Sequence, residues 1–411
     1  MSDEKCRFCG TLLRHSFCDL GCTPPSNAFL SKEQLHSPET HYPLHAMFCE
    51  SCFLVQLPQY QSPREMFKEY PYFSSYSGTW VSHLKAYVHQ SVKRFKLNRK
   101  SQVIEIASND GYLLQHFKGL NIPILGVEPA ENVAAVAIEQ GIPTRVDFFG
   151  VEVARAMCEE GIQADLLIGN NVLAHVPDLH DFVAGLKIIL KPGGRMTLEF
   201  PHIQQLIEKN QFDTIYHEHF SYFSLITADK VFSKHQLKIY DVEELETHGG
   251  SLRVYLCHED DKTGPISEAV LALRLKEINA GLNRLEPYMA FAKKVDEVRL
   301  DLLAFFISLR FDGKTAVAYG APAKGNTLLN TCGIKNDMLS YVVDRNPYKQ
   351  GRFLPGSRIP ICHPDKIKVT KPDYLVILPW NLQEEIMDQM AFIREWHGRF
   401  VVPIPKLQVF S

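Results

Sequence analysis

The chain has 411 residues, of which 45% are apolar and 22% are charged, and its formal net charge is −3. This length predicts two or three domains, and the near-neutral charge argues against a nucleic-acid-binding or anionic-membrane surface. The N-terminus, MSDEKCRFCG, lacks the apolar core of a signal peptide, and no apolar run approaches the roughly 18 residues of a membrane span. We therefore expect a cytoplasmic protein without a nucleic-acid or membrane partner, and its oligomeric state stays open.

Two Cys-x2-Cys pairs lie near the N-terminus, Cys6 with Cys9 and Cys49 with Cys52. Each pair can close a tight turn, and together they supply four thiolates for a tetrahedral zinc ion. Because protein would occupy every ligand position, this zinc would be structural and would hold together a small lobe over residues 1–62. Four unrelated buried cysteines are the alternative.

The other six of the ten cysteines carry less information. Cys18 and Cys22 form a Cys-x3-Cys pair that could compete for the metal, but they lie in the turn-rich stretch CDLGCTPPSNAF and are the less favourable pair. The last four are dispersed, and we expect them to be buried thiols. Thiols and metal ligands, rather than disulfides, are the expected forms in a cytosolic chain.

Residues 63–262 are expected to form an α/β domain with a helical lead-in over 63–100. From Ser101 onward, short apolar runs alternate with helical patterns, which predicts a parallel, doubly wound sheet. The helix DLHDFVAGLKIILKPGG is expected to end at a glycine cap, and LKIYDVEELE and SLRVYLCH to pair antiparallel at the sheet edge. The expected parallel strands are QVIEIAS, IPILGVEP, IPTRVDFF, ADLLIGNN and RMTLEFP.

The apolar spacing over residues 263–310 predicts a helical connector, which Pro287 is expected to break into two helices. Residues 311–411 then resume the α/β pattern and predict a second, Rossmann-like domain. Its expected strands are KTAVAYGA, LSYVVD and DYLVILP.

The first loop of the larger α/β domain points to a cofactor without a phosphate. The strand QVIEIAS leads from Glu105 into Ala-Ser-Asn-Asp-Gly, and of the dinucleotide-binding pattern G-x-G-x-x-G only Gly111 is present. Ala107 and Asn109 stand where an NAD-binding loop would have glycines. A loop with Asn109 and Asp110 instead suits the amino-acid tail of S-adenosylmethionine.

Five further residues follow from placing that cofactor at the carboxyl ends of the strands. Glu128 and the adjoining Pro129 end the second strand, where a carboxylate can bind both ribose hydroxyls. Asn170 and Asn171 end the fourth strand, beside the methionine portion. Phe148, after the third strand, can cover the adenine. The alternatives are turn caps for the asparagines and a core position for the phenylalanine.

These features together resemble a known family. The two cysteine pairs, YPYFSSYS, IEIASNDGYLL, GVEPAENVA, NNVLAHVPD, EFPH, QFDTIYHEHFSYFS and HGGSLRV occur in order along most of the chain. In this they are similar to zinc-containing, S-adenosylmethionine-dependent sugar C-methyltransferases, which act on nucleotide-linked 4-keto-6-deoxysugars in deoxysugar biosynthesis. The resemblance implies a zinc lobe, a class I methyltransferase domain and a C-terminal α/β domain that helps to hold the nucleotide-sugar.

Methylation of carbon requires a carbanion, so a base must remove a proton next to the ketone, at C3 or C5 of the sugar. The family's pattern makes His219 the candidate base, and a histidine is neutral enough near pH 7 for this task. Tyr216 could share a helical face with it and donate to the enolate oxygen. Glu218 could orient the site, and Tyr72 and His175 are further catalytic candidates.

Other interpretations of this histidine cluster remain open. A zinc protease needs H-E-x-x-H, and here the second histidine is missing. His217 and His219 could bind iron with a nearby carboxylate, or the histidines could be ordinary core groups on a packed helix. His217 could be a bystander, and Tyr76 could replace Tyr72.

The C-terminal loop YGAPAKGNTLLN is not a Walker A motif, because its lysine precedes the second glycine. Backbone N–H groups at a helix start and Lys324 still suit a diphosphate, so Gly325, Asn326 and Arg352 are further substrate-binding candidates. A loop needed only for chain reversal is the alternative. Two rival functions are an NAD-dependent nucleotide-sugar oxidoreductase and a non-catalytic zinc-ribbon interaction protein.

Overall fold

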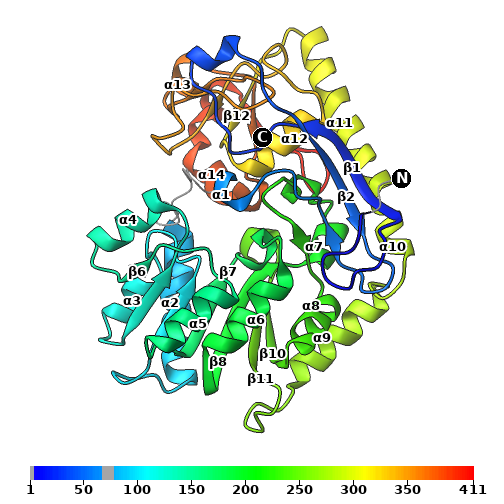
Figure 1. Cartoon of the computed structure of the whole chain (residues 1–411). Helices are drawn as coiled ribbons and strands as arrows, with labels where there is room; N and C mark the ends of the chain where they lie inside the picture. Colours follow the sequence, from blue (N-terminus) through cyan, green and yellow to red (C-terminus); the bar gives the residue numbers. More distant parts are fainter. Residues whose placement is uncertain (1–3, 67–77) are drawn as a thin grey trace.

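The computed structural model describes residues 4–66 and 78–411. Within them the chain forms sheets of four, seven and six strands. Figure 1 shows the seven-stranded sheet in the lower part of the molecule and the C-terminal unit in the upper part. The predicted architecture, a cysteine-rich lobe with two α/β units, is confirmed. The domain boundaries placed at residues 62, 262 and 310 stay predictions.

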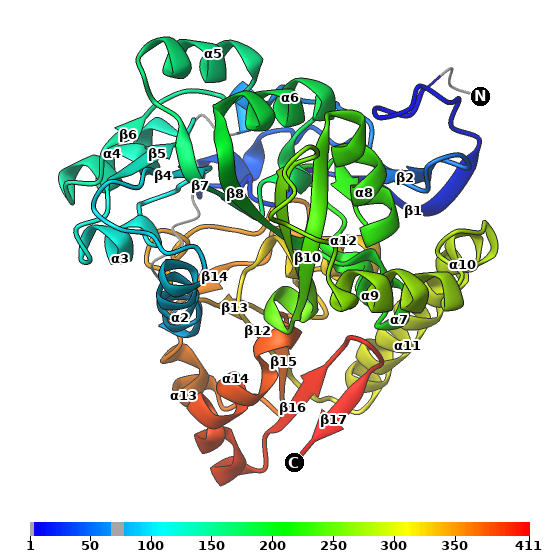
Figure 2. The same cartoon turned by 90° about the horizontal axis from the view of Figure 1, so that it is seen from below.

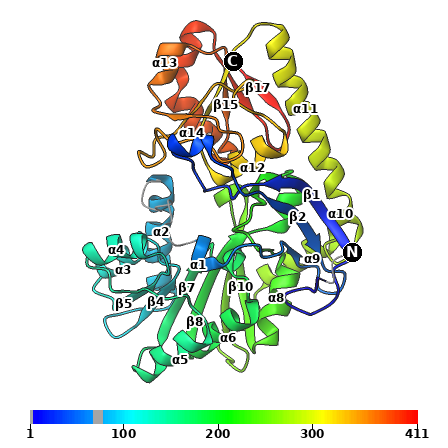
Figure 3. The same ribbon diagram turned by 45° about the horizontal axis from the view of Figure 1, so that its top comes forward.

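The N-terminal sheet is antiparallel, and its fourth strand comes from far along the chain. That strand begins two residues after His219. In its described residues the lobe has no separate core. Most of its apolar side chains join those of the long helix α11 (Phe291–Phe311) and the C-terminal sheet, and those around the cysteine pairs join the core of the central sheet. Figure 3 shows the first two lobe strands between the C-terminal unit and the rest of the chain. In spatial order the strands are β1 (His15–Thr23), β2 (Tyr42–Phe48), β3 (Val55–Gln56) and β9 (Ser221–Tyr222).

The seven-stranded sheet contains all five predicted parallel strands. The two segments predicted to pair antiparallel at its edge also do so. In spatial order the strands are β10 (Leu237–Leu245), β11 (Ser251–His258), β8 (Leu190–Pro201), β7 (Ala164–Asn170), β4 (Val103–Ile106), β5 (Ile124–Val127) and β6 (Thr144–Arg145).

Side chains of this sheet alternate between two apolar cores, as the pleat requires. Val103 packs into one core and Ile104 into the other, and Leu166 and Leu167 divide in the same way. Figure 2 shows helices on both faces. One face carries α5 (Val151–Glu159), α6 (Leu179–Ile189) and α8 (Leu225–Lys234); the other carries α2 (Gly78–Arg94) and α3 (Leu114–Lys118); α1 (Pro63–Met66), α4 (Glu131–Glu139) and α7 (Ile203–Glu208) complete this part of the chain.

Two predicted helix features are wrong. Helix α6 ends at Ile189 without a glycine cap, and the KPGG stretch belongs to β8, where a Cβ on Gly194 would lie 2.9 Å from the Ala164 carbonyl oxygen. Pro287 does not break the connector. The chain turns at Gly281, which has φ +80°, and Pro287 lies in the first turn of the next helix, where its missing N–H costs nothing. The connector helices are α9 (Glu268–Asn279), α10 (Glu286–Met289) and α11.

The C-terminal sheet contains the three predicted strands, β12, β13 and β15, and three that the sequence did not indicate. Every pair in it is parallel except the last. In spatial order the strands are β14 (Ile361–Cys362), β13 (Val342–Val343), β12 (Ala316–Tyr319), β15 (Tyr374–Ile377), β16 (Arg399–Val402) and β17 (Gln408–Phe410), with helices α12 (Ala323–Thr331), α13 (Lys366–Thr370) and α14 (Gln383–Gln389).

Candidate active site

A cavity of about 1140 Å³ lies between the central sheet and the C-terminal unit. One wall is formed by the carboxyl ends of β4, β5 and β7, where parallel sheets usually bind ligands. The start of α12 and the turn after β15 form part of another wall. The cavity exceeds the usual size for one small ligand, so it can hold a cofactor and a substrate. The predicted site residues that line it are Ala107, Asn109, Glu128, Pro129, Phe148, Asn170, Asn171, His175, Tyr216, His219 and Lys324.

The loop after β4 has the backbone of a glycine-rich turn without most of its glycines. The φ angles are 57° at Ala107, 50° at Asn109 and 77° at Gly111. A left-handed conformation costs a non-glycine residue about 1–2 kcal/mol, and such strain is typical of ligand sites. Alanine and asparagine therefore adopt the conformation that the sequence pattern assigns to glycine.

The Glu128 carboxylate is held by two backbone N–H groups. Asn109 donates to Oε2 at 3.0 Å and Ala130 to Oε1 at 2.9 Å. Burial raises the pKa of Glu128, and the two N–H groups oppose that shift. Each carboxylate oxygen keeps a second lone pair, so the group retains the acceptor capacity that the predicted ribose contact needs.

The Asn170 side chain fits a site that a polar ligand completes. It lies at the end of β7, it is 6% exposed, and within the described residues its amide nitrogen and oxygen have no hydrogen-bond partner. Leaving such a group unpaired costs about 1–3 kcal/mol, which a bound amino-acid tail would relieve. Phe148 is 40% exposed on the same cavity, a position that suits its predicted contact with the adenine.

Three predicted cofactor residues lie behind the cavity lining. Glu105 is fully buried in β4, and burial together with the charges of Glu128 and Asp110 holds its pKa well above the usual value. Asp110 is 1% exposed. A Cβ on Gly111 would lie 2.9 Å from Cγ1 of Ile142. These three residues pack behind the loop, and none of them lines the cavity.

The segment NQFDTIYHEHFSYFS is not a helix, so the predicted helical face is wrong. It forms a 3-10 turn, Phe212–Thr214, then an irregular turn, then β9. The His219 N–H donates to the Tyr216 carbonyl at 2.8 Å, and this turn brings the Tyr216 hydroxyl to 2.8 Å from Nε2 of His219. The two predicted residues are thus neighbours through a turn instead of a helix.

His219 is a neutral imidazole of defined tautomer. Its Nδ1 lies 2.8 Å from the Thr214 carbonyl oxygen, which can only accept, so Nδ1 carries the proton and Nε2 accepts from Tyr216. Burial, followed by the nearby His175, holds the pKa of His219 well below its usual value. The His175 ring lies 4.7 Å away in a T-shaped contact, and burial lowers its pKa to about 4.

Neither Glu218 nor the predicted bystander His217 lines the cavity. Nε2 of His217 lies 3.3 Å from the Pro43 carbonyl oxygen in the lobe, so His217 and His219 do not form the pair that an iron site would need. Glu218 instead accepts a hydrogen bond from the side chain of Asn27. Tyr72 and its alternative Tyr76 lie outside the described residues.

Two lysines of the C-terminal unit reach the cavity: Lys324, which was predicted, and Lys349, which was not. Lys324 donates to the His248 carbonyl at 3.1 Å and lies 4.9 Å from the Trp380 ring. Lys349 donates to the Ala321 carbonyl at 2.9 Å. Burial lowers the pKa of both ammonium groups. They form a cationic wall opposite the acidic end of the central sheet.

The other predicted substrate residues lie elsewhere. Gly325 packs against Leu378, the residue after β15, since a Cβ on Gly325 would lie 2.8 Å from Cβ of Leu378. Asn326 is 1% exposed, and within the described chain its amide atoms lack partners, but it is not part of the cavity lining. Arg352 is exposed on the surface. The structure therefore gives these three residues no contact with the cavity.

The cavity residues that the sequence interpretation missed include Asn27, His83, His248 and Lys349. His248 has φ 56° and lies 3.3 Å from the Asn171 amide, and burial lowers its pKa to about 3. It belongs to the quoted motif HGGSLRV, which was the one available signal. His83 accepts a hydrogen bond from Arg253 at 3.2 Å.

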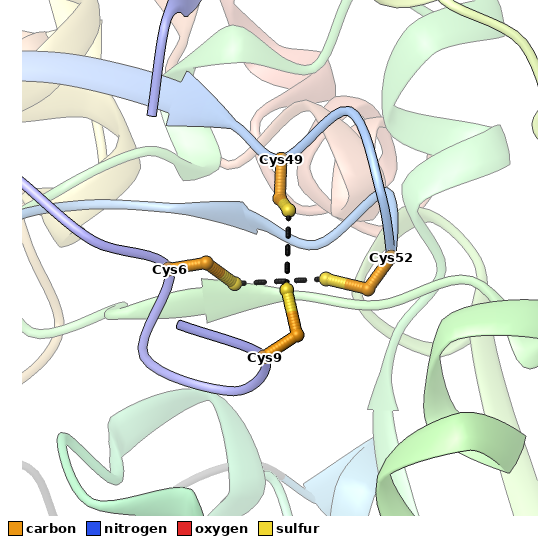
Figure 4. Close-up of side chains that lie close together, drawn as sticks. All are labelled: Cys6, Cys9, Cys49 and Cys52. Carbon is orange, nitrogen blue, oxygen red and sulfur yellow. Dashed lines mark hydrogen bonds between the residues drawn. The ribbon is translucent and has the colours of Figure 1, made fainter. Parts of the chain in front are cut away.

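The four predicted metal ligands converge on one point (Figure 4). Their sulfur atoms all lie within 4.8 Å of one another. Sγ of Cys6 is 3.6 Å from that of Cys52, and Sγ of Cys9 is 3.4 Å from that of Cys49. Tetrahedral zinc–thiolate bonds place sulfurs about 3.8 Å apart, so this donor set fits zinc. Cys18 and Cys22 lie in β1, outside the cluster.

Three family models match the chain in order. A zinc binding domain matches residues 6–67, a methyltransferase domain residues 80–242, and a C-methyltransferase C-terminal domain residues 246–405. The fold, the cysteine cluster and these matches define a methyltransferase. The C-methyltransferase NovU of Streptomyces niveus is 35% identical over 410 residues, which are 99% of this chain and 97% of that protein. The chain belongs to the family of zinc-containing C-methyltransferases.

Solved structures give partial matches. An S-adenosylmethionine-dependent methyltransferase from Anabaena variabilis is 16% identical with a TM-score of 0.36, covering 44% of this chain and 86% of that one. Another, from Clostridium acetobutylicum, is 10% identical with a TM-score of 0.33, covering 43% and 91%. The assignment rests on the family matches.

The predicted enzyme class and cofactors follow from the family. The protein is a C-methyltransferase that uses S-adenosylmethionine and carries a zinc ion on its four cysteines. The rival oxidoreductase and the non-catalytic zinc ribbon are therefore not supported. Across the residues that the structure describes, no helix has the length and apolarity to cross a membrane.

Proposed function

We propose that the enzyme methylates C3 or C5 of a nucleotide-diphosphate-linked 4-keto-6-deoxysugar, as a step in deoxysugar biosynthesis. One observation carries the proposal. His219, Glu128 and Lys324 line the same cavity. The base, the cofactor-binding carboxylate and the cationic wall can therefore act on one substrate. S-adenosylmethionine, held by Glu128, Asn170 and the strained loop at Ala107 and Asn109, supplies the electrophilic methyl group when bound.

His219 is suited to remove the proton next to the ketone. Nδ1 donates to Thr214, so the Nε2 lone pair is the basic site. The carbon–hydrogen bond breaks toward Nε2, and its electron pair moves into the enolate. Burial keeps the imidazole neutral before the reaction, which a general base requires.

Tyr216 is placed to stabilise the enolate oxygen. Its hydroxyl donates to Nε2 of His219. When a ketone oxygen lies next to that nitrogen, the single O–H can turn to the ketone, which frees the Nε2 lone pair to accept the proton. A positioned hydroxyl next to the oxygen lowers the energy of the developing charge. The lowered pKa of His175 leaves that ring neutral as well.

The cationic wall suits the diphosphate. Lys324 and Lys349 both face the cavity, next to the first residues of α12, whose backbone N–H groups point out of the helix. Anions bind at helix N-termini and next to ammonium groups. The sugar would then extend from this wall toward His219.

The deciding experiment combines a substrate panel with one variant pair. Wild-type enzyme and labelled S-adenosylmethionine are incubated with 4-keto-sugar nucleotides, and mass spectrometry detects methylated product; exchange in deuterated water identifies C3 or C5. His219→Asn should lower kcat at least about a hundredfold and leave S-adenosylhomocysteine binding unchanged in calorimetry. The matched control is His217→Asn, two residues away and off the cavity, which should keep near-normal turnover. Undiminished turnover in His219→Asn would remove its role as the base.

A further inference from the structure

The zinc lobe contributes the side chain of Asn27 to the cavity lining. Asn27 lies on the lobe loop, residues 24–30, and lines the cavity. The loop is fixed at both sides of this residue. Ser26 Oγ lies 3.2 Å from Oγ1 of Thr327 in α12, and the Phe29 ring lies 5.3 Å from the ammonium group of Lys349. A segment far from the methyltransferase sheet in sequence thus forms part of the site.

Glu218 fixes the orientation of the Asn27 amide. Glu218 Oε1 lies 2.7 Å from Nδ2 of Asn27. A carboxylate can only accept, so the amide nitrogen must face Glu218 and the amide oxygen must point away from it. Glu218 is 5% exposed and outside the cavity lining. Within the described chain, Oδ1 of Asn27 has no hydrogen-bond donor.

We propose that Asn27 is a substrate-recognition residue whose Oδ1 accepts a hydrogen bond from a hydroxyl group of the sugar ring. Glu218 is its positioning residue and sets which amide atom the substrate meets. This inference rests on the proposed function, because a sugar in the cavity supplies the hydroxyl. It gives the zinc lobe a part in substrate selection in addition to its part in the fold.

The test is steady-state kinetics of Asn27→Ala on the accepted keto-sugar nucleotide and on analogues that each lack one ring hydroxyl. The KM for the parent substrate should rise roughly tenfold, with a smaller change in kcat and the same affinity for S-adenosylhomocysteine. One analogue should show the same loss with wild-type enzyme and no further loss with Asn27→Ala. Ser26→Ala, which removes an anchor of the same loop, is the matched control and should change KM by less than about twofold.

Glu218 provides the second arm. Glu218→Gln keeps a carbonyl acceptor for Asn27 and should retain most of the affinity, whereas Glu218→Ala should raise KM as Asn27→Ala does, without adding to it in the double variant. An unchanged KM in Asn27→Ala, or an equal rise in Ser26→Ala, would overturn this inference and leave the proposed function standing. If wild-type enzyme methylates no keto-sugar nucleotide, both fail.

Discussion

The central sheet and the C-terminal sheet share one backbone arrangement at the carboxyl ends of their first two parallel strands. In the central sheet, Glu128 follows the second strand and accepts N–H bonds from Asn109 in the first loop and from the residue two positions further on. In the C-terminal sheet, Asp344 follows the second strand, β13, and accepts from Ala321 in the first loop and again from the residue two positions on, both at 2.8 Å. A carboxylate thus ties the first loop to the second strand in both units.

The difference lies in the surrounding charges. In the central sheet, burial and the nearby charges of Glu128 and Asp110 raise the pKa of Glu105. Asp344 instead has the ammonium group of Lys349 at 3.9 Å, and Lys324 reaches the same cavity. One loop geometry therefore serves two electrostatic environments. The first suits a cationic cofactor with ribose hydroxyls, and the second suits an anion.

The largest effect is expected at the acidic end. Glu128→Ala removes both the acceptor for the cofactor and the tie to Asn109, so affinity for S-adenosylhomocysteine should fall on the order of a hundredfold. Calorimetry measures this directly. The matching change at the opposite wall, Lys324→Met, should leave that affinity unchanged. Equal losses of affinity in the two variants would show that the cofactor and the nucleotide-sugar are not bound by separate walls of the cavity.

The cationic end is expected to respond next. Lys324→Met and Lys349→Met should each raise the KM for the nucleotide-sugar roughly tenfold, through loss of a charge-assisted hydrogen bond to phosphate. Added salt should weaken substrate binding by wild-type enzyme more than by either variant. A KM that ignores both substitutions would place the diphosphate elsewhere.

Two partly buried histidines that line the cavity, His175 and His248, make stability depend on pH. The folded pKa values of His175 and His248 are about 4 and about 3, below the roughly 6.5 of an unfolded histidine. The unfolded chain therefore binds protons first as the pH falls, and the free energy of unfolding should decrease below about pH 6.5, by up to about 1.4 kcal/mol per pH unit for each histidine. Urea denaturation at pH 7, 6 and 5 measures this slope, and His175→Gln should reduce it. A slope of the opposite sign would contradict the buried neutral state.

The smallest effect is expected at Arg352. This residue is exposed, so Arg352→Ala should change neither the substrate KM nor the cofactor affinity beyond about twofold. Kinetics and calorimetry on the same preparation check both. A large rise in KM would mean that the substrate extends beyond the cavity.

Much of the fold could be predicted because its signals are local. The apolar runs of β4, β5 and β7 and the paired cysteines can each be recognised from a few consecutive residues. The short strand β13, of two residues, also follows an apolar run, whereas β9 and β14 have no comparable pattern. The prediction of a helical face for the His219 segment was wrong, because the aromatic residues of this segment pack against the lobe and do not follow a helical period.

The candidate site was predictable only in part, for a related reason. Glu128 and Asn170 follow strands, so strand order alone places them at one edge. Asn27 and Lys349 reach the cavity through packing between distant segments, and nothing in their neighbours marks that contact. Conversely, Gly325 lies in the first turn of α12, whose start lines the cavity, but its missing side chain serves close packing.

Strand β9 has a consequence for how the protein is made. The cysteine cluster leaves the ribosome before β9, so its sheet stays incomplete until Tyr222 can pair with Val55. Metal uptake can therefore begin early in synthesis, whereas the lobe reaches its final shape only after most of the central sheet has been translated. A severed N-terminal fragment would keep its thiolates and expose an open strand edge, which favours aggregation.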